Sequence, residues 1–111
     1  MTNIMNSSSI MNKAKYEEKQ ITIIYIDQGN EIEEDLNISP MKTVSYLKRE
    51  IERIFHLNLG SLKKLKLRMT KKGERTGTTL DDDEKQLFDY RLQTGAKITF
   101  TILENIGGLY F

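Results

Sequence analysis

The strongest constraint on the fold is a change in the spacing of apolar residues in the first half of the chain. The segment 21–26, ITIIYI, is short and rich in β-branched residues, and the turn-forming sequence DQGN follows it. The segment 31–38, EIEEDLNI, has its apolar residues at even spacing, so the two segments predict an antiparallel β-hairpin. After Pro40 the spacing changes to three and four residues, which predicts a helix with one buried face and Thr43 as its cap. The apolar residues of this helix are Val44, Leu47, Ile51 and Ile54.

The rest of the chain continues this mixture of strand and helix patterns. In the segment 62–69, LKKLKLRM, basic and apolar residues alternate strictly from Lys64 to Met69, which predicts a half-buried strand. A polar, glycine-bearing loop is expected at 71–79, followed by short helical or turn segments, and KITFTIL at 97–103 is expected to be the closing strand. This order predicts the β-grasp, an α+β fold in which one main helix packs on one face of a mixed sheet of four to five strands.

Composition excludes several classes of function. The 111 residues are expected to form a single domain, with 17 basic and 16 acidic residues and a net charge of +1. There is no cysteine and one histidine, which excludes disulfides, thiol catalysis and multi-histidine metal sites. Without a nucleophile–base set or a phosphate-binding glycine loop, we expect that the chain is not an enzyme and uses no cofactor or metal. We also expect it to be a monomer. The near-neutral charge and the lack of a signal or membrane-spanning run predict no nucleic-acid or membrane partner and an intracellular location, cytoplasmic and/or nuclear.

The chain divides into three parts. Residues 1–19 are mostly Asn, Ser, Met and Lys without an apolar period, so they are expected to be a disordered arm. Residues 20–103 carry the strand and helix patterns and form the expected domain. Residues 104–111, ENIGGLYF, are expected to be a flexible C-terminal tail that contains Gly107 and Gly108.

The motifs before the helix and before the last strand resemble those of ubiquitin-like proteins. Pro40, Thr43 and Val44 stand in the family's arrangement of a proline, a helix-capping threonine and an aliphatic residue. The Asp-Tyr pair at 89–90, with Leu92 two residues later, matches the pattern that precedes the family's last strand. The resemblance depends on the joint order and spacing of these matches, and it covers nearly the whole predicted domain.

This resemblance implies a function for Gly107 and Gly108. Ubiquitin-like modifiers end on Gly-Gly because only a glycine backbone passes closely enough through the enzymes that activate them. By resemblance, a protease would remove residues 109–111, and activating and conjugating enzymes would join Gly108 to lysines of target proteins through an isopeptide bond. The arm of residues 1–19 and the sequence ENIGG resemble those of SUMO-type modifiers, and Lys15 in AKYE loosely resembles a chain-acceptor site. The first interpretation of the sequence is therefore a protein modifier.

A second interpretation is a binding domain that is not conjugated. The segment 71–98 has a long basic and glycine-bearing loop, an acidic step and a glycine before the last strand, and it resembles the ubiquitin-like domains of tubulin-folding cofactors. The loop is longer than the corresponding turn of ubiquitin, which favours this alternative. The alternative implies tubulin or chaperone partners.

The ubiquitin-like resemblance also locates two candidate partner-binding surfaces. Where ubiquitin has an apolar patch, this chain has Lys66 on the third strand and Thr99 and Thr101 on the last strand, so ordinary ubiquitin receptors are expected to bind poorly. SUMO-type modifiers use a groove between the second strand and the helix, which by resemblance implies strand residues 33–38 and the helix near Lys48. The acidic residues of this strand depart from the basic groove of that class and are equally typical of a protected edge strand. The candidates for the groove are Glu33, Asp35 and Lys48.

Basic residues accumulate along the third strand and the loop after it. They are Lys63, Lys64, Lys66, Arg68, Lys71 and Lys72. Such a stripe is able to meet RNA or an acidic tail, but no aromatic residues interleave with it, so a base-stacking platform is missing. We therefore expect a solvated strand face.

Overall fold

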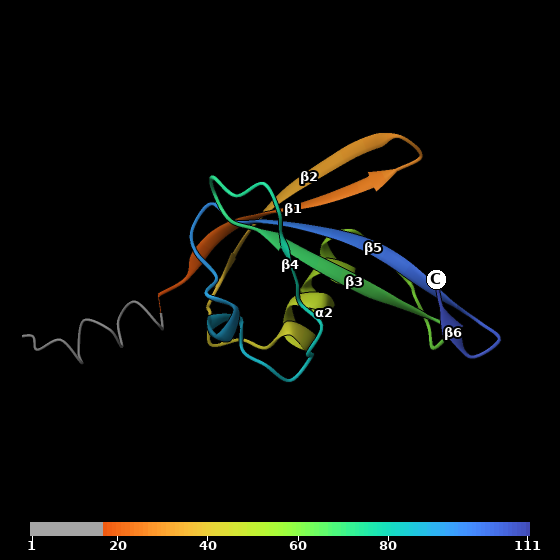
Figure 1. The fold of residues 1–111 in the computed structure, drawn as a ribbon. Helices are drawn as coiled ribbons and strands as arrows, with labels where there is room; N and C mark the ends of the chain where they lie inside the picture. Colours follow the sequence, from red (N-terminus) through yellow and green to blue (C-terminus); the bar gives the residue numbers. More distant parts are fainter. Residues whose placement is uncertain (1–16) are drawn as a thin grey trace, which may run out of the picture.

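The computed structural model describes residues 17–111 and shows one α-helix packed against one face of a mixed sheet (Figure 1). The α+β fold predicted from the sequence is confirmed. Two strands of only two residues each, β4 and β6, raise the sheet to six strands, above the four to five expected. In chain order the elements are β1 (Lys19–Asp27), β2 (Asn30–Ile38), α2 (Val44–Ile54), β3 (Lys63–Thr70), β4 (Thr78–Thr79), the 3-10 helix η1 (Leu87–Tyr90), β5 (Lys97–Ile106) and β6 (Leu109–Tyr110).

The sheet places the first strand and the last long strand side by side. Its order is β2-β1-β5-β3-β4, and β6 pairs with β5 outside this path. β1 and β5 run parallel, with Ile23 opposite Ile98, whereas β1 is antiparallel to β2 and β3 is antiparallel to β5. A parallel pair requires a crossover, which α2, β3 and their connecting loops provide.

The helix begins and ends at signals that the sequence carries. Thr43 has an extended backbone, and its Oγ1 accepts a hydrogen bond of 3.1 Å from the Tyr46 N–H, which satisfies a free donor of the first turn. The helix ends at Ile54, and His56 adopts a left-handed φ of 54° just beyond it. Three of the four residues predicted from the spacing of three and four are fully buried, namely Val44, Leu47 and Ile51, whereas Ile54 in the last turn is only half-buried.

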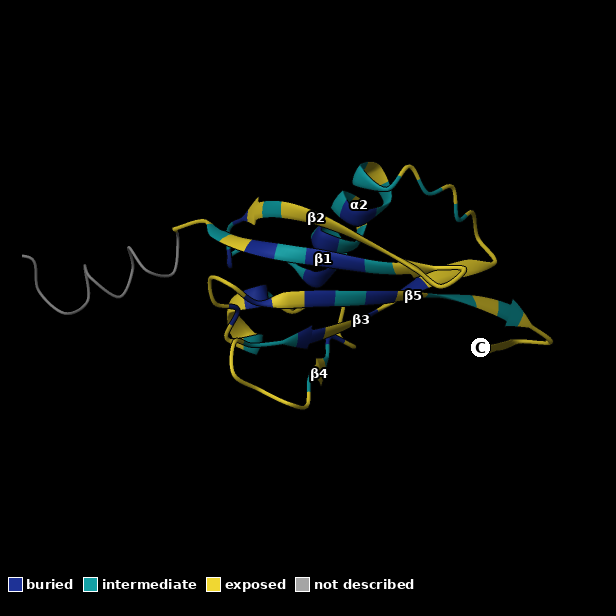
Figure 2. Ribbon diagram, turned by 90° about the horizontal axis from the view of Figure 1, so that it is seen from above, coloured by how far each residue is buried: buried dark blue, intermediate teal, exposed yellow. Residues whose placement is uncertain are grey.

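The core lies between α2 and one face of the sheet (Figure 2). Leu65, Leu67 and Met69 of β3 are buried and the basic residues between them are exposed, as the strict alternation predicted. At one end of the core the rings of Tyr25 and Phe100 are stacked, with 4.6 Å between their centroids. Within residues 17–111 no polar or charged residue is buried, so apolar packing supplies the stability of this core.

The ends of the expected domain differ from the structure by a few residues. β1 begins at Lys19, inside the expected arm, and residues 1–16 of that arm lie outside the described residues. β5 continues to Ile106, beyond the expected end at residue 103, and β6 follows it. The expected tail is therefore a hairpin in the structure, because the residues after the glycines pair back onto β5.

Candidate functional site

Gly107 and Gly108 form the turn of the β5–β6 hairpin. Their φ angles are 63° and 90°, left-handed values that glycine adopts without strain. Two consecutive positive φ angles in a two-residue loop are typical of a type I′ turn, whose twist matches that of the flanking strands. On either side of the turn Ile106 pairs with Leu109 and Asn105 pairs with Tyr110.

Hydrogen bonds and one cation–π contact hold this hairpin. The Gly108 N–H donates to Oδ1 of Asn105 at 3.0 Å, and Glu104 and Phe111 exchange backbone hydrogen bonds of 2.9 and 3.0 Å. The Lys64 ammonium lies 4.0 Å from the centre of the Tyr110 ring, within the range of a cation–π interaction. Gly108 is thus a turn residue, and the residues after it continue as a strand.

The candidate residues of the third and last strands lie together on the face of the sheet opposite α2, which we call the open face. Lys66 of β3 pairs with Thr101 of β5, and Arg68 pairs with Thr99. Directly opposite residues on adjacent strands point to the same side of a sheet, so these four side chains share one face. With Thr79 of β4 they line a hollow of about 210 Å³. The lining residues are two basic residues and three threonines, and their apolar atoms form most of the surface of the hollow.

Glu33 and Asp35 also lie on the open face, and not in the predicted groove beside the helix. Glu33 pairs with Ile24 and Asp35 pairs with Thr22, whose Oγ1 donates to Asp35 Oδ1 at 3.1 Å. Both partners on β1 alternate with Ile21 and Ile23, which belong to the core under α2, so both carboxylates point away from α2. The structure thereby brings onto one face two sets of residues that the sequence assigned to separate surfaces.

Lys48 lies on another side of the molecule. Its ammonium forms an ion pair of 2.6 Å with Asp83, in the loop before η1. A groove between β2 and α2 is present, and its strand side includes residues 36–38 of the predicted range 33–38. Its other side is formed by Lys42, Tyr46 and Glu50 and does not include Lys48. The prediction that joined Lys48 to the acidic strand is therefore corrected, because helix positions two residues apart face different directions.

Tyr46 and Glu50 give this groove its main electrostatic feature. Hydrogen bonding to Glu50 raises the pKa of the Tyr46 hydroxyl above its ordinary value of 10.0, and the negative charge of Glu50 acts in the same direction. Arg53 partly offsets this effect on the pKa, and its guanidinium lies 2.7 Å from the Glu50 carboxylate.

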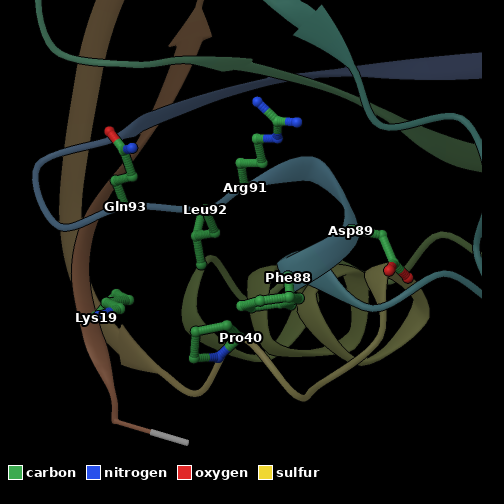
Figure 3. Close-up of a pocket in the computed structure, with 7 residues that line it drawn as sticks. All are labelled: Lys19, Pro40, Phe88, Asp89, Arg91, Leu92 and Gln93. Carbon is green, nitrogen blue, oxygen red and sulfur yellow. The ribbon is translucent and has the colours of Figure 1, made fainter. Parts of the chain in front are cut away.

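A hollow of about 540 Å³ beside η1 was not predicted. Pro40, Phe88 and Leu92 form its apolar part, and Figure 3 shows the Phe88 side chain lying next to Pro40. The Phe88 N–H donates to the Pro40 carbonyl at 2.8 Å, whereas the side chains of Arg91 and Gln93 point away from this apolar part (Figure 3). The sequence did carry one signal for this hollow. Phe88 directly precedes the Asp-Tyr pair, and the spacing of the apolar residues did not assign Phe88 to the core.

Two further expectations concern residues beyond these surfaces. Lys15, the predicted chain acceptor, lies outside the described residues. Across residues 17–111, no helix has the length and apolar character needed to cross a bilayer.

Comparison with known proteins identifies the relatives of this chain. Residues 20–101 match the ubiquitin-like domain family. The structure is similar to the N-terminal ubiquitin-like domain of tubulin-binding cofactor B from Drosophila melanogaster, with 18% identity and a TM-score of 0.59 over 90% of this chain and 97% of that one. It is similar to the C-terminal ubiquitin-like domain of mouse tubulin-specific chaperone e, with 17% identity and a TM-score of 0.56 over 76% of this chain and 84% of that one. For Caldiarchaeum subterraneum ubiquitin the identity is 20% and the TM-score is 0.55 over 82% of this chain and 99% of that one.

A comparison with curated proteins found no match. At these identities the similarity to solved structures shows the fold alone. The family match is stronger evidence for the family than the structural similarity, because it covers most of the chain. It runs from β1 into β5 and includes the helix and the residues that line the hollow on the open face. This chain therefore belongs to the ubiquitin-like domain family.

Proposed function

We propose that this chain is a protein-interaction domain of the tubulin-folding-cofactor type, which binds a partner without being conjugated to it. The observation that carries this proposal is the position of Gly107 and Gly108 in the turn of the β5–β6 hairpin. A modifier needs these glycines at the end of an extended tail, whereas an interaction domain needs only the surfaces of its sheet and helix. The domain would act through those surfaces and supply no catalysis of its own.

Conjugation would require the hairpin to open. Cleavage after Gly108 removes β6 and with it the backbone hydrogen bonds between Glu104 and Phe111. β5 would still be paired with β3 as far as Glu104, and the Asn105 N–H would still donate to the Leu62 carbonyl at 2.7 Å, so only residues 106–108 would be free to enter an enzyme. A segment of this length spans at most about 11 Å when fully extended, which is a short reach for a terminus that must thread a narrow channel.

Two of the structural relatives also favour an interaction domain. They belong to proteins described as a tubulin-binding cofactor and a tubulin-specific chaperone. The loop between β3 and β4, residues 71–77, has the basic and glycine-bearing composition by which the sequence resembles that class. Tubulin or a chaperone of tubulin is accordingly the first partner to test.

The first experiment measures the intact mass of the chain recovered from its native cell, together with an immunoblot against the domain. We expect one band and a mass that retains residues 109–111. A mass lacking these residues, together with a ladder of heavier species that disappears in Gly108→Ala, would overturn the proposal in favour of a modifier.

The second experiment measures capture of purified tubulin by the immobilised full chain, with immobilised ubiquitin as the control. We expect capture by this chain and none by ubiquitin. Equal retention on both proteins, or on neither, would contradict a partner of the tubulin class.

A further inference from the structure

The residues that line the hollow on the open face carry groups that suit an anion. They are Lys66, Arg68, Thr79, Thr99 and Thr101, whose apolar atoms form most of the surface of the hollow while their charged groups and hydroxyl groups supply its hydrogen-bond donors. A guanidinium binds a carboxylate through two parallel hydrogen bonds, and an ammonium and hydroxyl groups donate further bonds. Carboxylate oxygens only accept hydrogen bonds, so they are complementary to such a set of donors.

The cations of this hollow have no carboxylate partner among the described residues. Across residues 17–111 the ion pairs join Lys48 to Asp83 and Arg53 to Glu50, and neither pair includes a residue of the hollow. Glu33 and Asp35 of β2 share the open face, but β2 and β3 are separated by β1 and β5. Three strand spacings amount to about 14 Å, which exceeds the screening length of about 8 Å at physiological salt. The positive charge at β3 is therefore available to a partner.

The backbone at Gly77 passes close to one of these cations, Arg68. A β-carbon on Gly77 would lie 2.9 Å from both Cγ and Nε of the Arg68 side chain and 2.7 Å from the Met69 carbonyl oxygen. Only a glycine at this position lets the loop before β4 pass so close to Arg68. A side chain at position 77 would therefore displace the Arg68 side chain from the hollow.

We propose that the open face binds an acidic segment of a partner protein, whose carboxylates enter the hollow lined by Lys66, Arg68 and the three threonines. The segment runs beside β3, where Lys64 extends the row of cations on the same face. It stays clear of β2, where Glu33 and Asp35 would repel it. This inference rests on the proposed function, because it names the surface and the partner chemistry that an interaction domain of this kind would use.

The structure favours an acidic peptide over a nucleic acid. Single-stranded nucleic acids bind through aromatic side chains on which their bases stack, in addition to positive charge. Among the described residues of β3 and β5 on the open face there is no aromatic side chain, and Tyr110 beyond them already has the Lys64 ammonium over its ring. Carboxylates need only the cations and hydroxyl groups that the hollow provides.

The test measures binding of a fluorescein-labelled octaglutamate peptide to the full chain by anisotropy at about 0.05 M salt. We expect binding that weakens about fivefold in the double variant Lys66→Gln/Arg68→Gln, since each exposed ion pair contributes modestly. The double variant Thr99→Val/Thr101→Val keeps every charge and is expected to weaken binding about threefold, because it removes hydroxyl donors. Raising the salt to about 1 M, where the screening length is about 3 Å, should abolish binding.

The matched control is Arg49→Gln/Arg53→Gln, which removes the same charge from the exposed side of α2. We expect the control to bind octaglutamate as the wild type does. An equal loss in the control and in Lys66→Gln/Arg68→Gln would overturn the proposal, because it would show attraction by net charge alone. Amide chemical shifts that change on α2 and not on β3 and β5 would overturn it as well.

Three further outcomes would each overturn the proposal. An oligouridine probe that binds the same residues more tightly than octaglutamate would assign the hollow to nucleic acid. A concentration-dependent dimer that the Lys66→Gln/Arg68→Gln variant abolishes would assign it to the acidic strand of a second copy. Undetectable octaglutamate binding by a chain that still captures tubulin would refute the acidic-segment site and leave the proposed function intact.

Discussion

At the scale of single residues, contacts within one turn or one loop adjust the chemistry of the surface. The pairing of Tyr46 with Glu50 on α2 is the clearest case, because the carboxylate both accepts from the phenol and repels the phenolate. Both effects favour the protonated tyrosine in the folded state and so raise its pKa. The contact needs only a spacing of four residues on a helix, which the sequence displays.

This contact predicts a change in the alkaline titration of the protein. In Glu50→Ala the pKa of Tyr46 should fall, because the hydrogen bond and the negative charge that raise it are both removed. Arg53 and Arg49 remain, and both lower this pKa. Because the folded pKa lies above the unfolded one, the contact stabilises the wild type below about pH 10, and this stabilisation is lost as the pH rises through the folded pKa. Ring chemical shifts of Tyr46 measured against pH check the prediction.

Glu52→Ala, on the same helix, is the control and should leave the Tyr46 titration unchanged. The explanation by Glu50 fails if Glu50→Ala and Glu52→Ala titrate alike.

At the scale of elements, the β5–β6 hairpin decides how the C-terminal glycines are used. Its turn requires positive φ at Gly107 and Gly108, and its second strand consists of only Leu109 and Tyr110. Leu109 is 64% exposed, so the hairpin gains little from burial and depends on its turn and its hydrogen bonds. A change in the turn should therefore affect the hairpin without affecting the core.

The variant Gly107→Val should release β6 from β5. A β-branched residue at a φ of 63° is strained, whereas asparagine tolerates left-handed values, so Gly107→Asn is the matched control. We expect the Phe111 amide, which donates to the Glu104 carbonyl, to lose its protection from hydrogen exchange in Gly107→Val only. The thermal midpoint should change little in either variant.

If the Phe111 amide of the wild type exchanges as fast as an unstructured peptide, the glycines lie in an open tail after all. That result would restore the argument for a processed modifier.

At the scale of the whole molecule, one core joins the helix and every long strand. Leu47 of α2, Leu67 of β3 and Phe100 of β5 are all buried in the same apolar cluster. Removing any of them leaves a cavity that both the helix and the sheet line, so neither is expected to unfold by itself.

The variant Leu67→Ala should lower the free energy of unfolding by about 2 to 5 kcal/mol, as is typical for a fully buried leucine. Its urea transitions, followed by far-ultraviolet circular dichroism and by tyrosine fluorescence, should coincide. Leu62→Ala, at a residue that is 62% exposed, is the control and should cost less than about 0.5 kcal/mol. Separate transitions for the two signals would show that the helix and the sheet do not share one cooperative core.

The sequence by itself determined the elements and the faces they bury. Thr43 marked the start of α2, and the alternation in β3 separated the buried leucines from the exposed basic residues, as the structure has them. Both are local patterns with periods of 3.6 and 2 residues, so a single segment displays them completely. The joint spacing of Pro40, Thr43 and the Asp-Tyr pair was also enough to indicate the family that the comparison identified.

Tertiary structure alone decided which surfaces these faces make. β1 pairs with β5 in a register that places Thr22 opposite Lys97, more than 70 positions away in the sequence. This pairing brings acidic side chains of β2 and basic side chains of β3 onto the same face of one sheet. Lys48 turned toward Asp83, and Gly107 and Gly108 became a turn, only because distant or following residues were there to pair with them. A local pattern states which side of an element is apolar but not which other element meets it, since that choice depends on the packing of the whole core.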